Sequence, residues 1–507
     1  MTVSLWTCDL PEAAATIRFG EELALFLGPG DLVALSGDLG AGKSTLARAV
    51  IRSFVGDPAL EVPSPTYTLV QGYSGPRGDI THVDLYRLNA DEELAELGIG
   101  DVLAAGPVLV EWPERLDADL VNQALKLEIS DSGSGGRRTL DVHGGGNWPE
   151  RIERLRAVRK FIGDSRWAGA TREFLPVDAS ARRYERLRDD GRTAILMDMP
   201  RLPSAGDDAH YRDTVHLARD VAPFVSISAA LRGLGLSAPE ICHADTAQSL
   251  ALIEDFGDGV FNAMIAAGHD MGEPYRAAVD VLIRLARAGD RVAADDKTPI
   301  AVFDTAAMAG ELDLLLQWYW PLAFEGRLKR EARQGFERAW APLLADLAVA
   351  PRVLMLRDFH SPNLMWLPDR AGIARVGLLD FQDAVMAHPA YDLVSLLQDA
   401  RIDLPETLER DMLEYYFARY KEQVGALDEA AFRLAYATLG AQRNTKILGI
   451  FARLAIRDGK RRYLAHIDRV VGYLRGNLAH PGLSDLRGWY EAQQVLEPTI
   501  PLRDQIS

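Results

Sequence analysis

Apolar and polar positions change their spacing along the chain, and the first part alternates short apolar runs with a helical pattern. The segments DLVALS (31–36), HVDLY (82–86) and PVLVEW (107–112) are apolar enough to form buried strands. Between the first two lies TLARAVIRSF (45–54), whose spacing predicts a helix. Such alternation of strands and helices favours a parallel sheet in an α/β domain.

The same region ends in a predicted hairpin and a helix. Residues 126–144 predict two strands joined by a flexible Gly/Ser tip, and WPERIERLRAVRKFIG (148–163) predicts a basic helix. No Pro- or Ser-rich linker follows it, so we place the domain boundary near residue 157. The first predicted domain is therefore 1–157, with 158–507 as the second.

The hydrophobic pattern of the second domain is different. Residues 171–200 predict strand, turn and strand, and residues 250–259 predict a strand that runs into a glycine-rich turn. Beyond residue 270 the chain is mostly amphipathic helix, interrupted by two short apolar strands. We expect two lobes, a small one at about 158–256 and a helical one at about 257–507. No internal repeat is visible, so the second half is not a copy of the first.

Composition limits the classes of function. The 507 residues include 56 basic and 73 acidic side chains, a net charge of −17, which disfavours nucleic-acid binding by this chain alone. The first fifteen residues lack the features of a secretory signal, and no apolar run is long enough to span a membrane. Cys8 and Cys242 are far apart and form neither a disulfide framework nor a zinc site, so we expect a cytoplasmic protein.

The first motif with chemical content is GDLGAGKS (37–44), which fits G-x-x-x-x-G-K-[ST]. It follows a predicted strand and precedes a predicted helix, as a phosphate-binding loop requires. Lys43 can reach the β/γ-phosphates of ATP, and the Ser44 hydroxyl can bind Mg²⁺. The predicted nucleotide-binding residues are Gly37, Asp38, Leu39, Gly40, Ala41, Gly42, Lys43, Ser44 and Thr45.

Two carboxylates follow predicted strands where a magnesium site would need them, Asp84 in HVDLYRL and Glu111 in VLVEWPE. Each could also be an ordinary carboxylate at a strand end. Between the loop and Asp84 lies VPSPTYTLVQGY (62–73), rich in hydroxyl groups. This segment is either a surface loop or a switch that senses the γ-phosphate.

SGDLGAGKST, SPTYTLV, HVDLYRL and VEWPERL, in this order, resemble the TsaE family of small bacterial ATPases in tRNA threonylcarbamoyladenosine synthesis. The resemblance covers roughly residues 5–155. It implies nucleotide on the phosphate-binding loop, Mg²⁺ through Ser44 and Glu111, and Asp84 as the Walker-B-like carboxylate. It also implies TsaB- and TsaD-type protein partners, with tRNA contacted only through their complex.

A second, unrelated phosphate-handling pattern lies in LMLRDFHSPNLMW (354–366) and VGLLDFQDA (376–384). Asp358 and Asn363 reproduce the D-x-x-x-x-N spacing of a kinase catalytic loop. Asp358 would accept the proton of the substrate hydroxyl, and Asn363 and Asp380 would hold the magnesium ions that bridge the phosphates of ATP.

RDFHSPNL, LDFQDA and a following YDL resemble the aminoglycoside/choline phosphotransferase superfamily. Further segments, among them DASARRYERL, LIEDFGDG and AQRNTKILGIFARL, resemble its N-acetylmuramate/N-acetylglucosamine kinases of the AmgK type, over roughly residues 160–490. The resemblance implies a two-lobed, protein-kinase-like α+β domain. It also implies ATP-dependent phosphorylation of the anomeric hydroxyl, which gives an α-1-phosphate for cell-wall recycling.

Two departures from the superfamily pattern leave roles open. Leu356 stands where phosphotransferases commonly have histidine, and no lysine occupies the predicted strand TAILMDMP. Candidates for the missing phosphate contact are Ser180, Arg182 and Arg183.

Arginine binds carboxylates in a bidentate fashion, so Arg443 or Arg453 could hold the lactyl carboxylate of N-acetylmuramate. The second domain could instead phosphorylate an aminoglycoside, choline or another small alcohol, or be a catalytically weak binding module. The first domain could be a self-sufficient ATPase or a regulator of the kinase. The interpretation that we favour is a fusion of a P-loop ATPase with an amino-sugar kinase.

Overall fold

The chain forms two units, Met1–Asp198 and Met199–Ser507, which are described separately below. The structure is a computed structural model that describes residues 3–65, 68–87, 98–132, 137–176, 182–206, 208–292, 299–324 and 328–497. The prediction that the functional domains meet near residue 157 stays a prediction.

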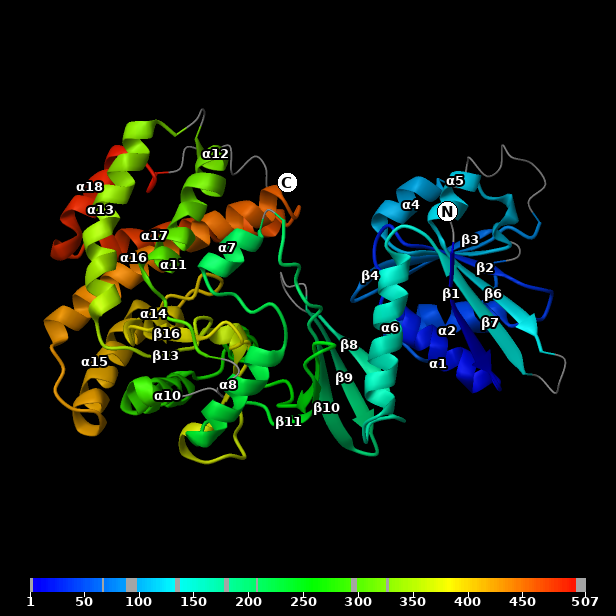
Figure 1. The fold of residues 1–507 in the computed structure, drawn as a ribbon, viewed down its shortest axis with the longest axis horizontal. Coiled ribbons are helices and arrows are strands. Elements are labelled where there is room, and N and C mark those ends of the chain that lie inside the picture. Colours follow the sequence, from blue (N-terminus) through cyan, green and yellow to red (C-terminus); the bar gives the residue numbers. More distant parts are fainter. Residues whose placement is uncertain are drawn as a thin grey trace. The chain divides into compact units, whose positions relative to one another are not determined.

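A seven-stranded mixed sheet forms the centre of the first unit, with strand order β1-β7-β6-β2-β5-β4-β3 (Figure 1). Its strands are β1 (Val3–Leu10), β2 (Leu32–Ser36), β3 (Val70–Gly75), β4 (Gly78–Asp84), β5 (Val108–Glu111), β6 (Leu125–Asp131) and β7 (Arg138–Gly144). The pairs β2–β6, β2–β5 and β4–β5 are parallel, as the alternating pattern predicts. The other pairs are antiparallel: β3–β4 and β6–β7 are hairpins, and β1 pairs with the distant strand β7.

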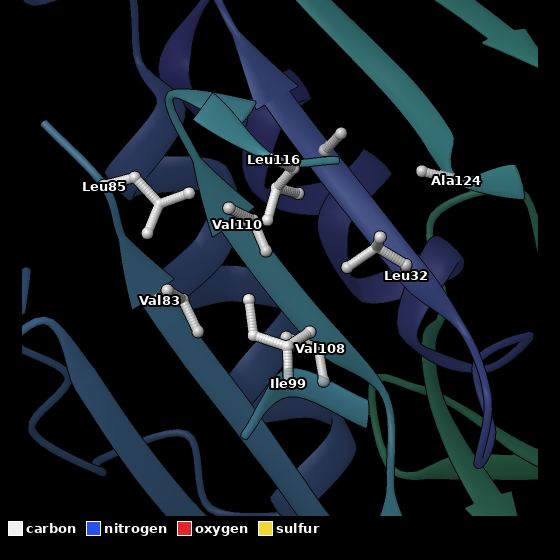
Figure 2. Packing of buried hydrophobic residues seen from close by; sticks show 9 residues of the cluster. Leu32, Val83, Leu85, Ile99, Val108, Val110, Leu116 and Ala124 are labelled. Atoms are coloured by element: carbon white, nitrogen blue, oxygen red, sulfur yellow. The ribbon is translucent and has the colours of Figure 1, made fainter. Parts of the chain in front are cut away.

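Helices pack on this sheet and bury its apolar side chains. They are α1 (Ala13–Ala24), α2 (Lys43–Val55), α4 (Ile99–Ala105), α5 (Ala118–Gln123) and α6 (Trp148–Gly163). One cluster joins alternate residues of β2, β4 and β5 to Ile99 of α4, and Figure 2 shows Leu32, Val83 and Val108 side by side within it. The alternation of side chains along each strand thus puts one set of residues on this face.

Three further strands belong to the same unit: β8 (Thr171–Leu175), β9 (Arg183–Asp189) and β10 (Arg192–Asp198). They pair in sequence as antiparallel neighbours. The sequence pattern predicts only two strands in residues 171–200. The sequence pattern misses one strand, because it treats the polar residues between β8 and β9 as part of a single strand–turn–strand motif.

The second unit is mostly helical. Its helices are α7 (Ala209–Thr214), α8 (Ala222–Gly233), α9 (Phe261–Ala266), α10 (Gly272–Ala288), α11 (Thr305–Leu314), α12 (Trp320–Ala323), α13 (Arg330–Val349), α14 (Ala390–Leu397), α15 (Glu406–Gln423), α16 (Glu429–Ile456), α17 (Ile467–Leu478) and α18 (Ser484–Ala492). The hairpin of β11 (Ile241–Asp245) and β12 (Leu250–Glu254) is also part of it.

Four strands of three residues each carry the predicted kinase loops. They are β13 (Val353–Met355), β14 (Leu364–Trp366), β15 (Val376–Leu378) and β16 (Val385–Ala387). β13 pairs with β16 and β14 with β15, both antiparallel. β14 follows the first loop and β15 precedes the second. Because these two strands pair, the loop after β13 lies close to the loop after β15.

The central helix of this unit, α16, crosses α11 at Gly449. A Cβ atom at this glycine would lie 2.4 Å from the carbonyl carbon of Leu314. We expect Gly449→Ala to lower the free energy of unfolding by about 1–3 kcal/mol, because the two backbones must separate. Thermal and urea unfolding of the variant measure this loss.

Gly472 in α17 is the matched control, because a Cβ atom there meets nothing within 4 Å. Gly472→Ala should raise stability by about 0.5–1 kcal/mol, since alanine is the better helix former. Equal stability of Gly449→Ala and the unchanged protein would contradict the close helix crossing.

Candidate functional sites

The phosphate-binding loop in the first unit joins β2 to the N-terminus of α2. Gly37 has φ +136°, and a Cβ atom there would lie 2.3 Å from the carbonyl oxygen of Ile129. Only glycine therefore fits at this position. Gly40 and Gly42 also have positive φ, with open space where a Cβ would point. Arg138 of β7 donates from Nε to the Ala41 carbonyl at 3.0 Å and holds the far side of the loop.

Lys43 is the first residue of α2 and lies over its own loop. Its ammonium donates to the carbonyl oxygens of Gly37 at 2.6 Å and Asp38 at 3.0 Å. The same Nζ lies 3.9 Å from the centre of the Trp112 ring. Burial lowers the pKa of Lys43, while the carboxylates of Glu111 and nearby acidic residues oppose this. Within the described part of the chain, this buried cation donates to carbonyls and lies over an aromatic face, so it is well suited to take the negative charge of a phosphate.

Three predicted polar residues meet at the carboxyl ends of β4 and β5. Ser44 Oγ donates to Glu111 Oε2 at 3.2 Å, and Asp84 and Glu111 are paired neighbours across the two parallel strands. Asp84 accepts from the Ser64 hydroxyl at 3.1 Å and from the Tyr86 N–H at 3.0 Å. A hydroxyl and two carboxylates form the oxygen donor set that suits Mg²⁺, so these residues fit the ion that the sequence implies.

The proposed switch segment 62–73 is described only in part. Ser64 contacts Asp84 as stated above, but Thr66 and Tyr67 lie outside the described residues. The role of the segment as a sensor stays a prediction.

In the second unit, Asp358 and Asn363 lie in one loop between β13 and β14. The Asn363 side-chain amide donates to the Asp358 carbonyl at 3.0 Å, which leaves its amide oxygen for another partner. The Leu379 N–H donates to the Asn363 carbonyl at 3.0 Å, so Asp380 directly follows a residue bound to the catalytic loop. Asp380 has φ +59°, a conformation that is uncommon outside glycine and typical of functional loops. The structure therefore brings Asp358, Asn363 and Asp380 together.

Two buried carboxylates hold the main chain of the catalytic loop. Asp392 of α14 accepts the N–H groups of Leu356 at 2.6 Å and Arg357 at 2.9 Å. Asp399, just after this helix, accepts from the Ser361 hydroxyl at 2.5 Å and from its N–H at 3.2 Å. Burial raises the pKa of Asp392 to about 7, although the two N–H groups oppose this. The loop is thus fixed on both sides of Asp358.

A buried charge network lies beside Asp358. Glu311 of α11 is fully buried and forms ion pairs with Arg357 and, at 3.0 Å, with Lys446 of α16. Lys446 also donates to the Tyr391 hydroxyl at 3.0 Å. Burial disfavours ionised Glu311, but the charges of Lys446 and Arg357 outweigh this and lower its pKa. Arg357, the residue before Asp358, has φ +70°, a strained conformation. Its ion pair with Glu311 holds this part of the loop in place.

The electrostatic surroundings keep Asp358 ionised. Its side chain is 38% exposed, so a substrate can reach it. Burial disfavours the carboxylate, but the charges of Lys446, His360 and Arg357 outweigh burial and lower its pKa below the ordinary aspartate value. A carboxylate at this position can orient a hydroxyl group and accept its proton.

The remaining predicted site residues lie in different surroundings. Arg183 donates to the buried carboxylate of Asp198, and its guanidinium lies 3.6 Å from the Phe26 ring centre. Arg182 precedes β9, and Ser180 lies outside the described residues. Contact of these three residues with ATP stays a prediction.

Arg443 and Arg453 both belong to α16, ten positions apart and so about 15 Å apart along its axis. Arg443 is 5% exposed and donates to the Gln398 carbonyl at 3.2 Å. Arg453 is half-buried, and its Nε has no hydrogen-bond partner among the described residues. Their role in substrate binding stays a prediction.

Comparison with known proteins finds two families along the chain. The family model "Threonylcarbamoyl adenosine biosynthesis protein TsaE" matches residues 10–139, and "Phosphotransferase enzyme family" matches residues 171–431. The chain belongs to the phosphotransferase enzyme family, joined to an N-terminal TsaE-family domain. The predicted fold class, an α/β P-loop domain followed by a kinase-like phosphotransferase domain, is thereby confirmed.

Curated relatives cover both parts. An N-acetylmuramate/N-acetylglucosamine kinase of Caulobacter vibrioides is 38% identical over 68% of this chain and 98% of its own length. The kinase of that name from Pseudomonas aeruginosa is 30% identical over 62% of this chain and 86% of its own. A tRNA threonylcarbamoyladenosine biosynthesis protein TsaE of Rickettsia bellii is 40% identical over 23% of this chain and 83% of its own.

Membership of the phosphotransferase enzyme family makes this chain an enzyme with kinase activity. Both families use ATP, so the chain combines two ATP-dependent proteins. The predictions of a fusion and of an enzyme are confirmed.

Sequence reasoning missed several supporting residues. His82 lies two positions before Asp84 on the same strand face, and its Nε2 is 3.1 Å from Glu111 Oε1. The alternation of strand side chains could have indicated it. Arg138 on the loop, and Glu311 and Asp399 near Asp358, carry no such signal, because only the folded chain brings them to their sites.

Lys446 offers a direct test of the electrostatics of the kinase site. Among the charges acting on Asp358 it has the largest effect in lowering the pKa. We expect Lys446→Met to raise that pKa, so that the acid limb of kcat/KM moves to higher pH. Activity then falls at low pH and is least affected above neutrality. Rates measured between pH 4 and 9, with circular dichroism to verify folding, give the shift.

Lys421→Met is the control, because Lys421 is an exposed lysine whose side chain pairs with Glu429. Its pH profile should match that of the unchanged protein. An unshifted acid limb in a folded Lys446→Met variant would contradict the assigned electrostatic role.

Proposed function

We propose that the chain is bifunctional. Its C-terminal part phosphorylates the anomeric hydroxyl of N-acetylmuramate and N-acetylglucosamine with ATP and yields α-1-phosphates for cell-wall recycling. Its N-terminal part is an ATPase that supports tRNA threonylcarbamoyladenosine modification. The observation that carries the kinase proposal is the 38% identity to a named amino-sugar kinase along 98% of that relative, with Asp358, Asn363 and Asp380 brought together.

In the proposed phosphoryl transfer, Asp358 accepts the proton of the anomeric hydroxyl while the oxygen of that hydroxyl forms a bond to the γ-phosphorus. The bond from that phosphorus to the β–γ bridging oxygen breaks, and ADP leaves. Asn363 and Asp380 would hold Mg²⁺, which supplies neutralisation of phosphate charge when it is bound. Asp392 and Asp399 keep the loop main chain in place, so Asp358 stays oriented throughout.

For the lactyl carboxylate of N-acetylmuramate we favour Arg453 over Arg443. The two lie too far apart along α16 for one carboxylate to bind both. Arg443 already donates to a main-chain carbonyl and is almost fully buried, whereas Arg453 Nε lacks a partner among the described residues. Arg453 also lies 5.5 Å from the ring centre of Tyr211, whose pKa burial raises to about 12, so this tyrosine stays a neutral donor.

For the N-terminal domain we propose Mg²⁺ binding through Ser44 and Glu111, with Asp84 as the second carboxylate. We propose TsaB- and TsaD-type proteins as its partners. The net charge of −17 supports contact with tRNA only through such a complex. We place the protein in the cytoplasm, where ATP and these partners are present. Within the described residues, no helix has the length and apolar character needed to cross a bilayer.

The decisive experiment is ATP-dependent phosphorylation of the two sugars, read by phosphorus NMR, with Asp358→Asn and Lys43→Ala as variants. We expect an anomeric phosphate signal that falls by at least about a thousandfold in rate for Asp358→Asn and is kept in Lys43→Ala. Failure of the unchanged protein to phosphorylate either sugar would refute the substrate assignment and direct attention to aminoglycosides, choline or a non-catalytic second domain.

Substrate preference tests the arginine assignment. We expect Arg453→Gln to raise KM for N-acetylmuramate about tenfold or more, because a charge-assisted contact to the carboxylate is lost. N-acetylglucosamine lacks that carboxylate and serves as the internal control, so its KM should change little. The ratio of the KM for N-acetylmuramate to the KM for N-acetylglucosamine compares the two variants. A larger increase in this ratio in Arg443→Gln than in Arg453→Gln would overturn the preference for Arg453.

A further inference from the structure

The first unit contains a cleft that neither ATP-binding motif accounts for. It has a volume of about 440 Å³ and lies between the turn after α1, the β3–β4 turn, the start of α6 and strands β8 and β9. We call it the arginine cleft, because Arg77, Arg151, Arg182 and Arg183 line it together with Asp31 and Phe174. All these residues belong to Met1–Asp198.

Arg151 and Arg183 each pair with a carboxylate. Arg151 forms a two-pronged ion pair with Asp31, at 2.6 and 2.5 Å. Arg183 pairs with Asp198, which also accepts from Arg154 of α6.

Arg77 differs from both. Its two terminal nitrogens donate to the carbonyls of Ala24 at 2.7 Å and Leu27 at 2.9 Å, at the end of α1. Its guanidinium lies between the rings of Phe54 and Phe174, at 4.4 and 4.3 Å. Within the described ranges no carboxylate forms an ion pair with it. Burial lowers its pKa to about 10; the nearby carboxylate of Glu185 opposes this, and the charge of Arg183 adds to it.

A cation in such surroundings has donor capacity left over. A guanidinium carries five N–H donors, and Arg77 spends two of them on the carbonyls. Guanidinium groups match the oxygens of phosphate in geometry and charge, and a phosphate monoester is close to dianionic at neutral pH. The cleft volume falls within the ordinary range for small-molecule sites, so there is room for more than the phosphate group itself.

We propose that the arginine cleft binds a small phosphate monoester, whose phosphate contacts Arg77 and the neighbouring arginines. The phosphate could come from a sugar phosphate or from a nucleoside monophosphate, which share this chemistry. The site is separate from the phosphate-binding loop at 37–44 and from the loops of Asp358 and Asp380. It does not depend on the function proposed above.

The alternative is that the arginines only fasten β8–β10 to the rest of the unit. Asn147 separates the two explanations. It lines the cleft at the N-terminus of α6, is exposed, and Asn147→Asp changes charge without changing shape. A negative charge there suits the helix terminus, so the variant should fold. A structural role predicts no effect of this charge on anion binding.

The experiment is isothermal titration calorimetry on the full chain carrying Lys43→Ala, which removes anion binding at the phosphate-binding loop. All samples also carry Asp380→Asn, which removes nucleotide binding at the kinase site, and the probes are inorganic phosphate, ribose 5-phosphate and AMP. We expect saturable binding of at least one probe, weakened about tenfold by Asn147→Asp through charge repulsion and at least as much by Arg77→Gln. The tighter of the two organic probes identifies the source of the phosphate.

Asn122→Asp is the matched control, an identical change at an exposed residue of α5 outside the cleft. It should leave the dissociation constant unchanged. The proposal is overturned if no probe binds saturably, or if Asn147→Asp and Arg77→Gln bind as tightly as the parent with Lys43→Ala and Asp380→Asn.

Discussion

The kinase site depends on two buried carboxylates that bind the main chain of one loop. Asp392 holds the residues before Asp358, and Asp399 holds Ser361 after it. Asp392 binds main-chain N–H groups, which every residue except proline has. Its support of the loop is therefore kept although Leu356 stands where histidine is usual. Arg357, whose backbone is strained, forms an ion pair with Glu311. Lys446 pairs with the same glutamate, and its charge also acts on the Asp358 carboxylate.

The phosphate-binding loop achieves rigidity differently. Gly37 passes so close to the Ile129 carbonyl that no side chain fits, and Arg138 fixes the opposite side. Lys43 is buried over Trp112 and donates to carbonyls of its own loop, so its charge is in place before a phosphate arrives. Both sites thus fix their backbone before substrate binds, one with glycine geometry and the other with ionised side chains.

Local patterns predicted most of the elements. The strands β2, β4, β5, β6 and β7 and helix α6 follow from apolar runs and helical spacing, whereas β1 and β3 were not predicted. GDLGAGKS and D-x-x-x-x-N carry their chemistry within a few residues. The β6–β7 hairpin was predicted, but the antiparallel pairs β1–β7 and β3–β4 and the third strand within 171–200 were not. The partner of β1 lies far from it in sequence, so no local pattern indicates that pairing. For the same reason Glu311, 47 positions before Asp358, and Arg138 had no signal of their own. The arginine cleft likewise joins segments that only folding brings together.

The central claim is that one chain holds two separate nucleotide sites. Equilibrium titration of the full chain with a non-hydrolysable ATP analogue and Mg²⁺ tests it most directly. The account predicts that the unchanged chain binds two molecules of the analogue and that the Lys43→Ala and Asp380→Asn variants each bind one. Each substitution should remove one bound molecule independently of the other. A stoichiometry of one in the unchanged protein, or loss of both sites in either variant, would contradict it.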